Sequence, residues 1–96
     1  MSIWENSKIT LLWYSKGEAS EHNPCVVRID DQEIVVEYED EGMVQYRGKN
    51  TGDGHFELTA PAVKGHAFLH MFPGSNALEG SWEEGGQRGM WRITLD

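Results

Sequence analysis

Apolar and polar residues alternate along short stretches of this chain, and this period of two constrains its fold more than any other feature. In the stretch 33–39, Ile34, Val36 and Tyr38 alternate with mostly acidic residues. Successive side chains of a β-strand point to opposite faces, so the pattern predicts a strand with one buried and one wet face. Similar runs recur and predict about eight short strands, over 8–14, 25–30, 33–39, 43–49, 55–60, 66–72, 77–83 and 87–95.

Turn-forming residues separate these runs, among them Asn23-Pro24, Asp40-Glu41-Gly42 and Gly85-Gly86. The chain has 96 residues, the size of one domain spanning 1–96. Short strands at this regular spacing predict an all-β fold, in which a meander closes into a single small antiparallel β-barrel. We expect the strands around 9–13 and 91–95 to close the barrel or nearly close it. No segment shows a clear helical period.

The last hairpin has a register that can be read from the sequence. Gly85-Gly86 suits a two-residue turn of type I′ or II′. With that turn Trp82 lies opposite Gly89, and Trp91 lies opposite Gly80, so each indole covers a glycine of the neighbouring strand. On the other face the same register pairs opposite charges, Glu83 with Arg88 and Glu79 with Arg92.

A second hairpin is expected over 33–49. A three-residue turn, Asp40-Glu41-Gly42, places glycine where such turns favour a positive φ. Its register gives an apolar inner face and a mixed outer face. The expected inner pairs are Tyr38 with Val44, Val36 with Tyr46, and Ile34 with Gly48.

The Gly/aromatic hairpins of the C-terminal half resemble those of small calycin-like barrels, both lipocalin-like and avidin-like. The resemblance covers residues 43–95 and rests on four stretches, Tyr46-Arg47-Gly48, Gly54-His55-Phe56-Glu57-Leu58, Leu78-Glu79-Gly80-Ser81-Trp82 and Gly89-Met90-Trp91-Arg92-Ile93-Thr94-Leu95. The chain lacks the length, the N-terminal Gly-x-Trp and the disulfide of lipocalins, and the polar ligand set of avidins. The resemblance therefore implies a calycin-like fold and transfers no binding residue.

Charge and cysteine content narrow the classes of partner and the compartment. Eight basic and sixteen acidic residues give a net charge of −8, which disfavours nucleic acid and anionic membrane surfaces. Cys25 is the only cysteine, so no internal disulfide forms. The N-terminal region has a short apolar run, 9–14, with no basic stretch before it, and is unlike a signal peptide. We therefore expect a cytoplasmic protein.

No set of residues in the sequence matches a known arrangement of nucleophile, base and oxyanion stabiliser, so we expect no enzymatic activity and no cofactor. Cys25 follows a proline at the start of an expected strand and has acidic surroundings on balance, which favours an inert, buried thiol. The glycine-rich segment 48–54 lacks the Gly-Lys-Ser/Thr of a phosphate loop and is typical of a hairpin turn.

The histidines are the most suggestive candidates for metal binding. His66 and His70 have a spacing that places two ligands together on a helix. On a strand the same spacing separates them by about 13 Å, too far to share one ion. His55 could approach one of them if the fifth and sixth strands are neighbours, with Glu57 as a third ligand on the same face. We nevertheless expect no metal site.

Aromatic residues on the expected inner faces suggest a binding site. An eight-stranded barrel has room for its side chains or for one small ligand. Our first hypothesis is a non-enzymatic module that binds a small apolar molecule inside the barrel, with four ligand-binding residues, Tyr38, Tyr46, Trp82 and Trp91.

The alternative hypothesis is an acidic protein-interaction module, such as an inhibitor, an immunity-type protein or a small assembly subunit. It uses the outer face, where Leu12 and Met90 are expected to be exposed. Phe68 and Phe72 join them if Ala67, Leu69 and Met71 point inward. We expect a monomer or a homodimer.

Overall fold

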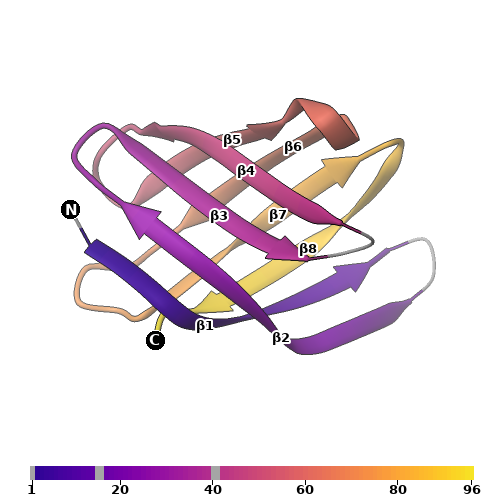
Figure 1. Ribbon diagram of the computed structural model, residues 1–96, viewed down its shortest axis with the longest axis horizontal. Coiled ribbons are helices and arrows are strands. Elements are labelled where there is room, and N and C mark those ends of the chain that lie inside the picture. The colour runs from indigo at the N-terminus through magenta and orange to yellow at the C-terminus, as the bar shows by residue number, and fades with distance from the viewer. Residues whose placement is uncertain (1, 15–16, 40–41) are drawn as a thin grey trace.

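Eight antiparallel strands follow one another around a closed barrel in the computed structural model, which describes residues 2–14, 17–39 and 42–96. Each strand pairs with the next one along the chain, and the last pairs with the first (Figure 1). The strands are β1 (Ser2–Trp13), β2 (Glu18–Ile29), β3 (Glu33–Glu39), β4 (Met43–Asn50), β5 (His55–Ala60), β6 (Gly65–His70), β7 (Ala77–Glu84) and β8 (Gln87–Thr94). The all-β, single-barrel prediction is confirmed.

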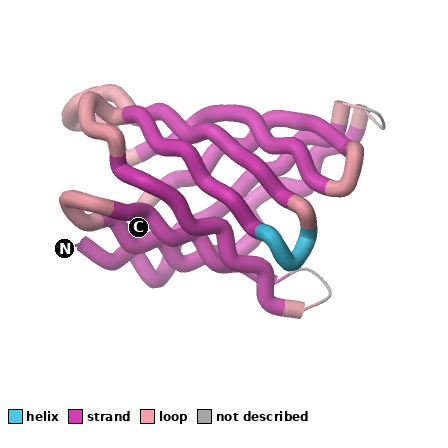
Figure 2. Tube along the Cα trace, turned by 90° about the horizontal axis from the view of Figure 1, so that it is seen from above, coloured by secondary structure: helices cyan, strands magenta, loops and turns pink. Residues whose placement is uncertain are grey.

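The ladder between β1 and β8 closes the barrel, as the sequence predicts. Ile9 lies opposite Ile93 and Trp13 opposite Gly89 in one continuous antiparallel register. The strands run obliquely around the barrel, and the connections gather at its two ends (Figure 2). Loops at the ends and side chains on the outer face are therefore the surfaces open to partners.

Both hairpin registers expected from the sequence are confirmed. In β7–β8, Trp82 lies opposite Gly89 and Trp91 opposite Gly80. Gly85 and Gly86 have φ values of +57° and +87°, and a type I′ turn requires positive φ at both central residues. In β3–β4 the expected inner pairs recur, Tyr38 with Val44, Val36 with Tyr46 and Ile34 with Gly48.

The hydrophobic core fills the barrel interior, because the strands alternate inward apolar and outward polar side chains. Ile9, Ile34, Leu58, Leu69 and Leu78 are fully buried there. Partly buried side chains, including Leu11 and Trp13, pack against this core.

The first two strands are longer than the sequence predicts, and the expected turn at Asn23-Pro24 is wrong. Both residues lie within β2, opposite Ile9 and Lys8 of β1. Register shifts flank this stretch on both sides, and an irregular ladder tolerates a residue without a backbone N–H. The alternation of apolar and polar residues did not predict these extra strand residues, because the polar stretches 2–7 and 18–23 contain few apolar residues.

The connections after β3 and after β5 each contain a residue with positive φ. Asp40 and Glu41 of the expected three-residue turn lie outside the described residues, and Gly42 has a φ of +123°. A short 3₁₀ helix, η1 (Pro61–Val63), joins β5 to β6. Lys64 then adopts a left-handed conformation, which turns the chain into β6.

Glycine at position 80 is required by the close approach of β6. A Cβ atom there would overlap the backbone carbonyl of Phe68. The same carbonyl accepts a hydrogen bond of 3.2 Å from Nε1–H of Trp91, which lies opposite Gly80. The missing side chain thus lets the indole reach across β7 to β6.

We expect Gly80→Ala to destabilise the barrel by about 2 kcal/mol or more, because backbone must move to admit the new Cβ atom. Urea unfolding followed by tryptophan fluorescence measures this change. Ser81→Ala, at the exposed neighbouring position, is the matched control and is expected to stay within about 0.5 kcal/mol of the wild type. Equal unfolding midpoints for the two variants would contradict the close-approach argument.

Candidate functional site

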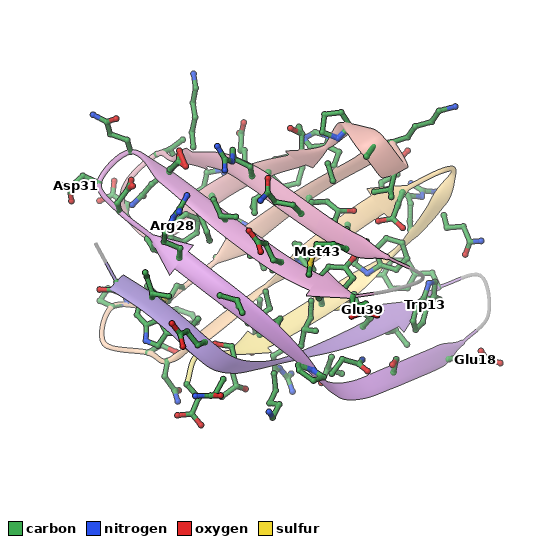
Figure 3. The ribbon with its side chains drawn as sticks, in the orientation of Figure 1. Trp13, Glu18, Arg28, Asp31, Glu39 and Met43 are labelled. Carbon is green, nitrogen blue, oxygen red and sulfur yellow. The ribbon has the colours of Figure 1, made fainter. Side chains whose placement is uncertain are left out.

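The four residues predicted to bind a ligand converge at one end of the barrel interior. Tyr38, Tyr46, Trp82 and Trp91 line a common space together with Leu11, Trp13 and Glu84. We call the five aromatic residues of this set, Trp13, Tyr38, Tyr46, Trp82 and Trp91, the aromatic cluster. Figure 3 shows Trp13 at the end of the barrel where β3 ends and β4 begins.

Hydrogen bonds within the protein fix the polar atoms of this cluster. Nε1–H of Trp82 donates to the Met90 carbonyl over 3.0 Å. The Tyr46 hydroxyl donates to Oε1 of Glu84 over 2.7 Å. The rings meet edge to face, with centroids 6.0 Å apart for Trp13–Trp82 and 5.2 Å apart for Tyr46–Trp91. Such contacts hold the rings in defined positions.

The space left inside the aromatic cluster is small. Its volume is about 20 Å³, enough for about one water molecule. Sites for small organic ligands occupy roughly 300–1,000 Å³. A ligand among Tyr38, Tyr46, Trp82 and Trp91 would therefore have to displace a ring, and half-buried Trp13 is the one at the mouth. The ligand-binding role of these residues stays a prediction.

A much larger hollow lies on the outer surface, between β6–β8 and the loops at one end. We call it the outer groove, and its volume is about 590 Å³. Its lining residues are Tyr14, Asp53, Gly54, His70, Met71, Phe72, Pro73, Ser75, Ala77, Glu79, Gly80, Ser81 and Met90.

The outer groove combines exposed apolar side chains with acidic ones. Phe72 is 84% exposed, Tyr14 58% and Met90 47%. Asp53 and Glu79 supply carboxylates, and none of the described lining residues is Lys or Arg. Large apolar side chains grouped on a surface are typical of an interaction site.

The outer face expected from the sequence is confirmed in most of its residues. Ala67 and Leu69 point inward and are fully buried, which leaves Phe68 on the outer face of β6. Met71 follows β6, is only partly buried against the core and also lines the outer groove. Phe72 and Met90 are exposed as expected, whereas Leu12 is only half-buried.

Two of the three candidate histidines converge, and the third does not. His55 on β5 lies opposite His70 on β6, and their Nδ1 atoms are 3.2 Å apart. Glu57 Oε1 lies 3.6 Å from Nε2 of His55, on the other side of that ring. His66 instead contacts Phe68, with ring centroids 4.9 Å apart. Within the described part of the chain, no group of three or more His, Cys, Asp or Glu could hold a metal ion.

Cys25 is buried, and its position accounts for the expected lack of reactivity. Only 3% of the residue is exposed, and burial raises the pKa of the thiol to about 11. A neutral, buried thiol is a poor nucleophile at neutral pH.

Comparisons with protein-family models, with curated proteins and with solved structures find no match to this chain. The structure shows an eight-stranded antiparallel closed barrel, and the calycin-like resemblance of residues 43–95 stays a prediction. Among the described residues, no helix has the length and apolar character needed to cross a membrane.

The sequence predicted only some of the residues of the outer groove, because its lining comes from segments that are far apart along the chain. Met90 and Phe72 could be predicted as exposed, since each is a large apolar residue at an outward position. Nothing in the sequence marks Tyr14 and Asp53 as groove residues, because they follow β1 and β4 and reach the groove only when the barrel closes.

The ionisation of Tyr46 is expected to make the stability of the folded protein depend on pH. Burial and the hydrogen bond to the Glu84 carboxylate raise its pKa well above the ordinary value of 10.0. Tyr46 then stays neutral in the native state at a pH where the unfolded chain loses that proton. The stability that the neutral hydroxyl contributes is present below about pH 10 and is lost as the pH rises further.

We expect the stability difference between the wild type and Tyr46→Phe to shrink by about 1.4 kcal/mol between about pH 9 and about pH 11. Urea unfolding at both pH values measures the difference. Below that range the variant is expected to be less stable by about 1–3 kcal/mol, because Glu84 loses its donor. A difference that stays constant with pH would contradict a raised pKa at Tyr46.

Proposed function

We propose that this protein is a non-enzymatic interaction module whose outer groove binds an apolar, positively charged segment of a partner protein. The observation that carries the proposal is the contrast between two hollows. The barrel interior leaves about 20 Å³ at the aromatic cluster, and the outer groove offers about 590 Å³. Binding in the groove needs no core side chain to move.

The side chains of the groove suit such a segment. Exposed Tyr14, Phe72 and Met90 offer apolar area, and aromatic residues and methionine are enriched in protein interfaces. Asp53 and Glu79 lie in the same groove. Glu79 already pairs with Arg92, so a Lys or Arg beside an apolar residue would meet the carboxylate of Asp53. The net charge of −8 disfavours a second copy of this chain as the occupant. We also propose a cytoplasmic location, supported by the single, buried Cys25.

The alternative is a small apolar ligand held by the aromatic cluster inside the barrel. Trp13 supports this possibility, because it is only partly buried and covers Trp82 at the mouth of the interior. If the Trp13 ring turned away, a ligand could take its place against Trp82. The two sites share no residue, so one set of variants distinguishes them.

Peptides selected from a random displayed library against the wild-type protein test the proposal. We expect the selected sequences to combine an aromatic or long aliphatic residue with Lys or Arg. Fluorescence anisotropy then measures their affinity. The double variant Phe72→Ser/Met90→Ser is expected to weaken binding at least about tenfold, because both anchors leave the groove. Raising NaCl from about 0.05 M to about 0.5 M is expected to weaken it further.

Met43→Ser is the matched control. Met43 is a methionine on β4 (Figure 3). It is 68% exposed and lies outside the outer groove. Its affinity for the peptides should equal that of the wild type. If no peptide is enriched, or if the double variant binds as the wild type does, the groove is not the site. Binding of apolar small molecules that is lost in Trp13→Ala would support the interior instead.

A further inference from the structure

Neighbouring strands β5 and β6 place two imidazoles in direct contact on the outer face of the barrel. His55 and His70 occupy directly opposed positions of the antiparallel ladder. Their ring centroids are 4.8 Å apart, and their Nδ1 atoms approach to 3.2 Å. We propose that this pair is an open, two-histidine binding site for a divalent first-row transition metal, with the highest affinity for Cu²⁺. The site does not depend on the function proposed for the outer groove.

The separation of the two nitrogens fits a shared metal ion. Imidazole nitrogens bind such ions at about 2.0–2.1 Å, so two ligands at a tetrahedral angle lie roughly 3.3–3.4 Å apart. Two cis ligands of a square-planar ion lie roughly 2.9 Å apart. The observed 3.2 Å falls between these values. A metal ion can therefore bind between the Nδ1 atoms of His55 and His70 after small rotations of the rings.

Metal binding requires each Nδ1 to present its lone pair, which moves the ring proton to Nε2. For His55 the group next to Nε2 is Glu57, whose Oε1 lies 3.6 Å away. A carboxylate on the far nitrogen of a ligating histidine is the usual partner that selects the tautomer and orients the ring. Glu57 is thus a positioning residue for Nδ1 of His55 and not a metal ligand.

The surroundings hold the rings in place while leaving the metal position open. Phe68 stacks on the His55 ring, with centroids 6.2 Å apart and planes 28° apart. Glu79, which lies opposite His70 on β7, is engaged with Arg92, whose Nε donates to it over 3.1 Å. The side chain of His55 is 38% exposed, so water can complete the coordination.

The ligand set determines which ions bind. Two imidazoles with open positions lack the four ligands of a structural zinc site. Affinity in such a site follows the general order in which Cu²⁺ exceeds Ni²⁺ and Zn²⁺. Cu²⁺ also accepts two cis nitrogen ligands and two waters in a tetragonal arrangement. We therefore take Cu²⁺ as the probe.

Titration of the folded protein with CuCl₂ in a non-coordinating buffer, followed by electron paramagnetic resonance, tests the site. We expect one bound Cu²⁺ per chain with the pulsed signature of two imidazoles. His55→Ala and His70→Ala are each expected to remove the two-imidazole signature and to lower affinity at least about tenfold. Glu57→Gln is expected to keep both imidazoles and to weaken binding about tenfold. Zn²⁺ should compete only at higher concentration.

His66→Ala is the matched control, because His66 lies on the same strand as His70 and is also exposed, but packs on Phe68. It should retain the affinity and the signature of the wild type. His55→Gln and His70→Gln repeat the test with a larger polar side chain, and near-ultraviolet circular dichroism confirms that each variant is folded. A single-imidazole signature in the wild type, or a two-imidazole signature that survives loss of His70, would overturn the proposal.

Discussion

The backbone ladder between β1 and β8 is the constraint on which the rest of this structure depends. An open sheet of this length would leave two strand edges free to pair with other chains, and closure removes them. The closed ring has eight strands, and a barrel of eight strands has an interior just wide enough for side chains. The core therefore forms inside a ring of set size, and each inward residue has to fit that volume.

At one end of the barrel, two tryptophans fit into the interior because each lies opposite a glycine. Trp82 lies opposite Gly89 and Trp91 opposite Gly80, so each large ring occupies the space that a glycine leaves. The indole nitrogens donate to backbone carbonyls, which ties the rings to the sheet. Little space is thereby left at the aromatic cluster, and the larger outer groove lies outside the barrel, where the 71–76 loop meets the outer face of β6–β8.

The two candidate sites lie side by side on that outer face and differ in origin. The outer groove depends on loops and on Tyr14 after β1, which closure brings together, and it presents exposed apolar and acidic side chains. The histidine pair depends on the register of one ladder, in which His55 faces His70. His70 belongs to both, so an occupant of one could affect the other through this residue.

The sequence by itself determined the strand order, the closing strands and two hairpin registers, because alternation and turn residues act locally and a slip of one residue reverses every side chain. It also determined the inward positions of Tyr38, Tyr46, Trp82 and Trp91. It did not determine the pairing of the polar stretches 2–7 and 18–23. These stretches are strands because of the neighbouring strands they pair with, and their residues do not alternate between apolar and polar. Only the tertiary structure decided how much space the aromatic cluster leaves, that His55 meets His70 while His66 does not, and that Tyr14 and Asp53 reach one groove. These features depend on side-chain volume and on contacts between residues distant along the chain, which no local pattern encodes.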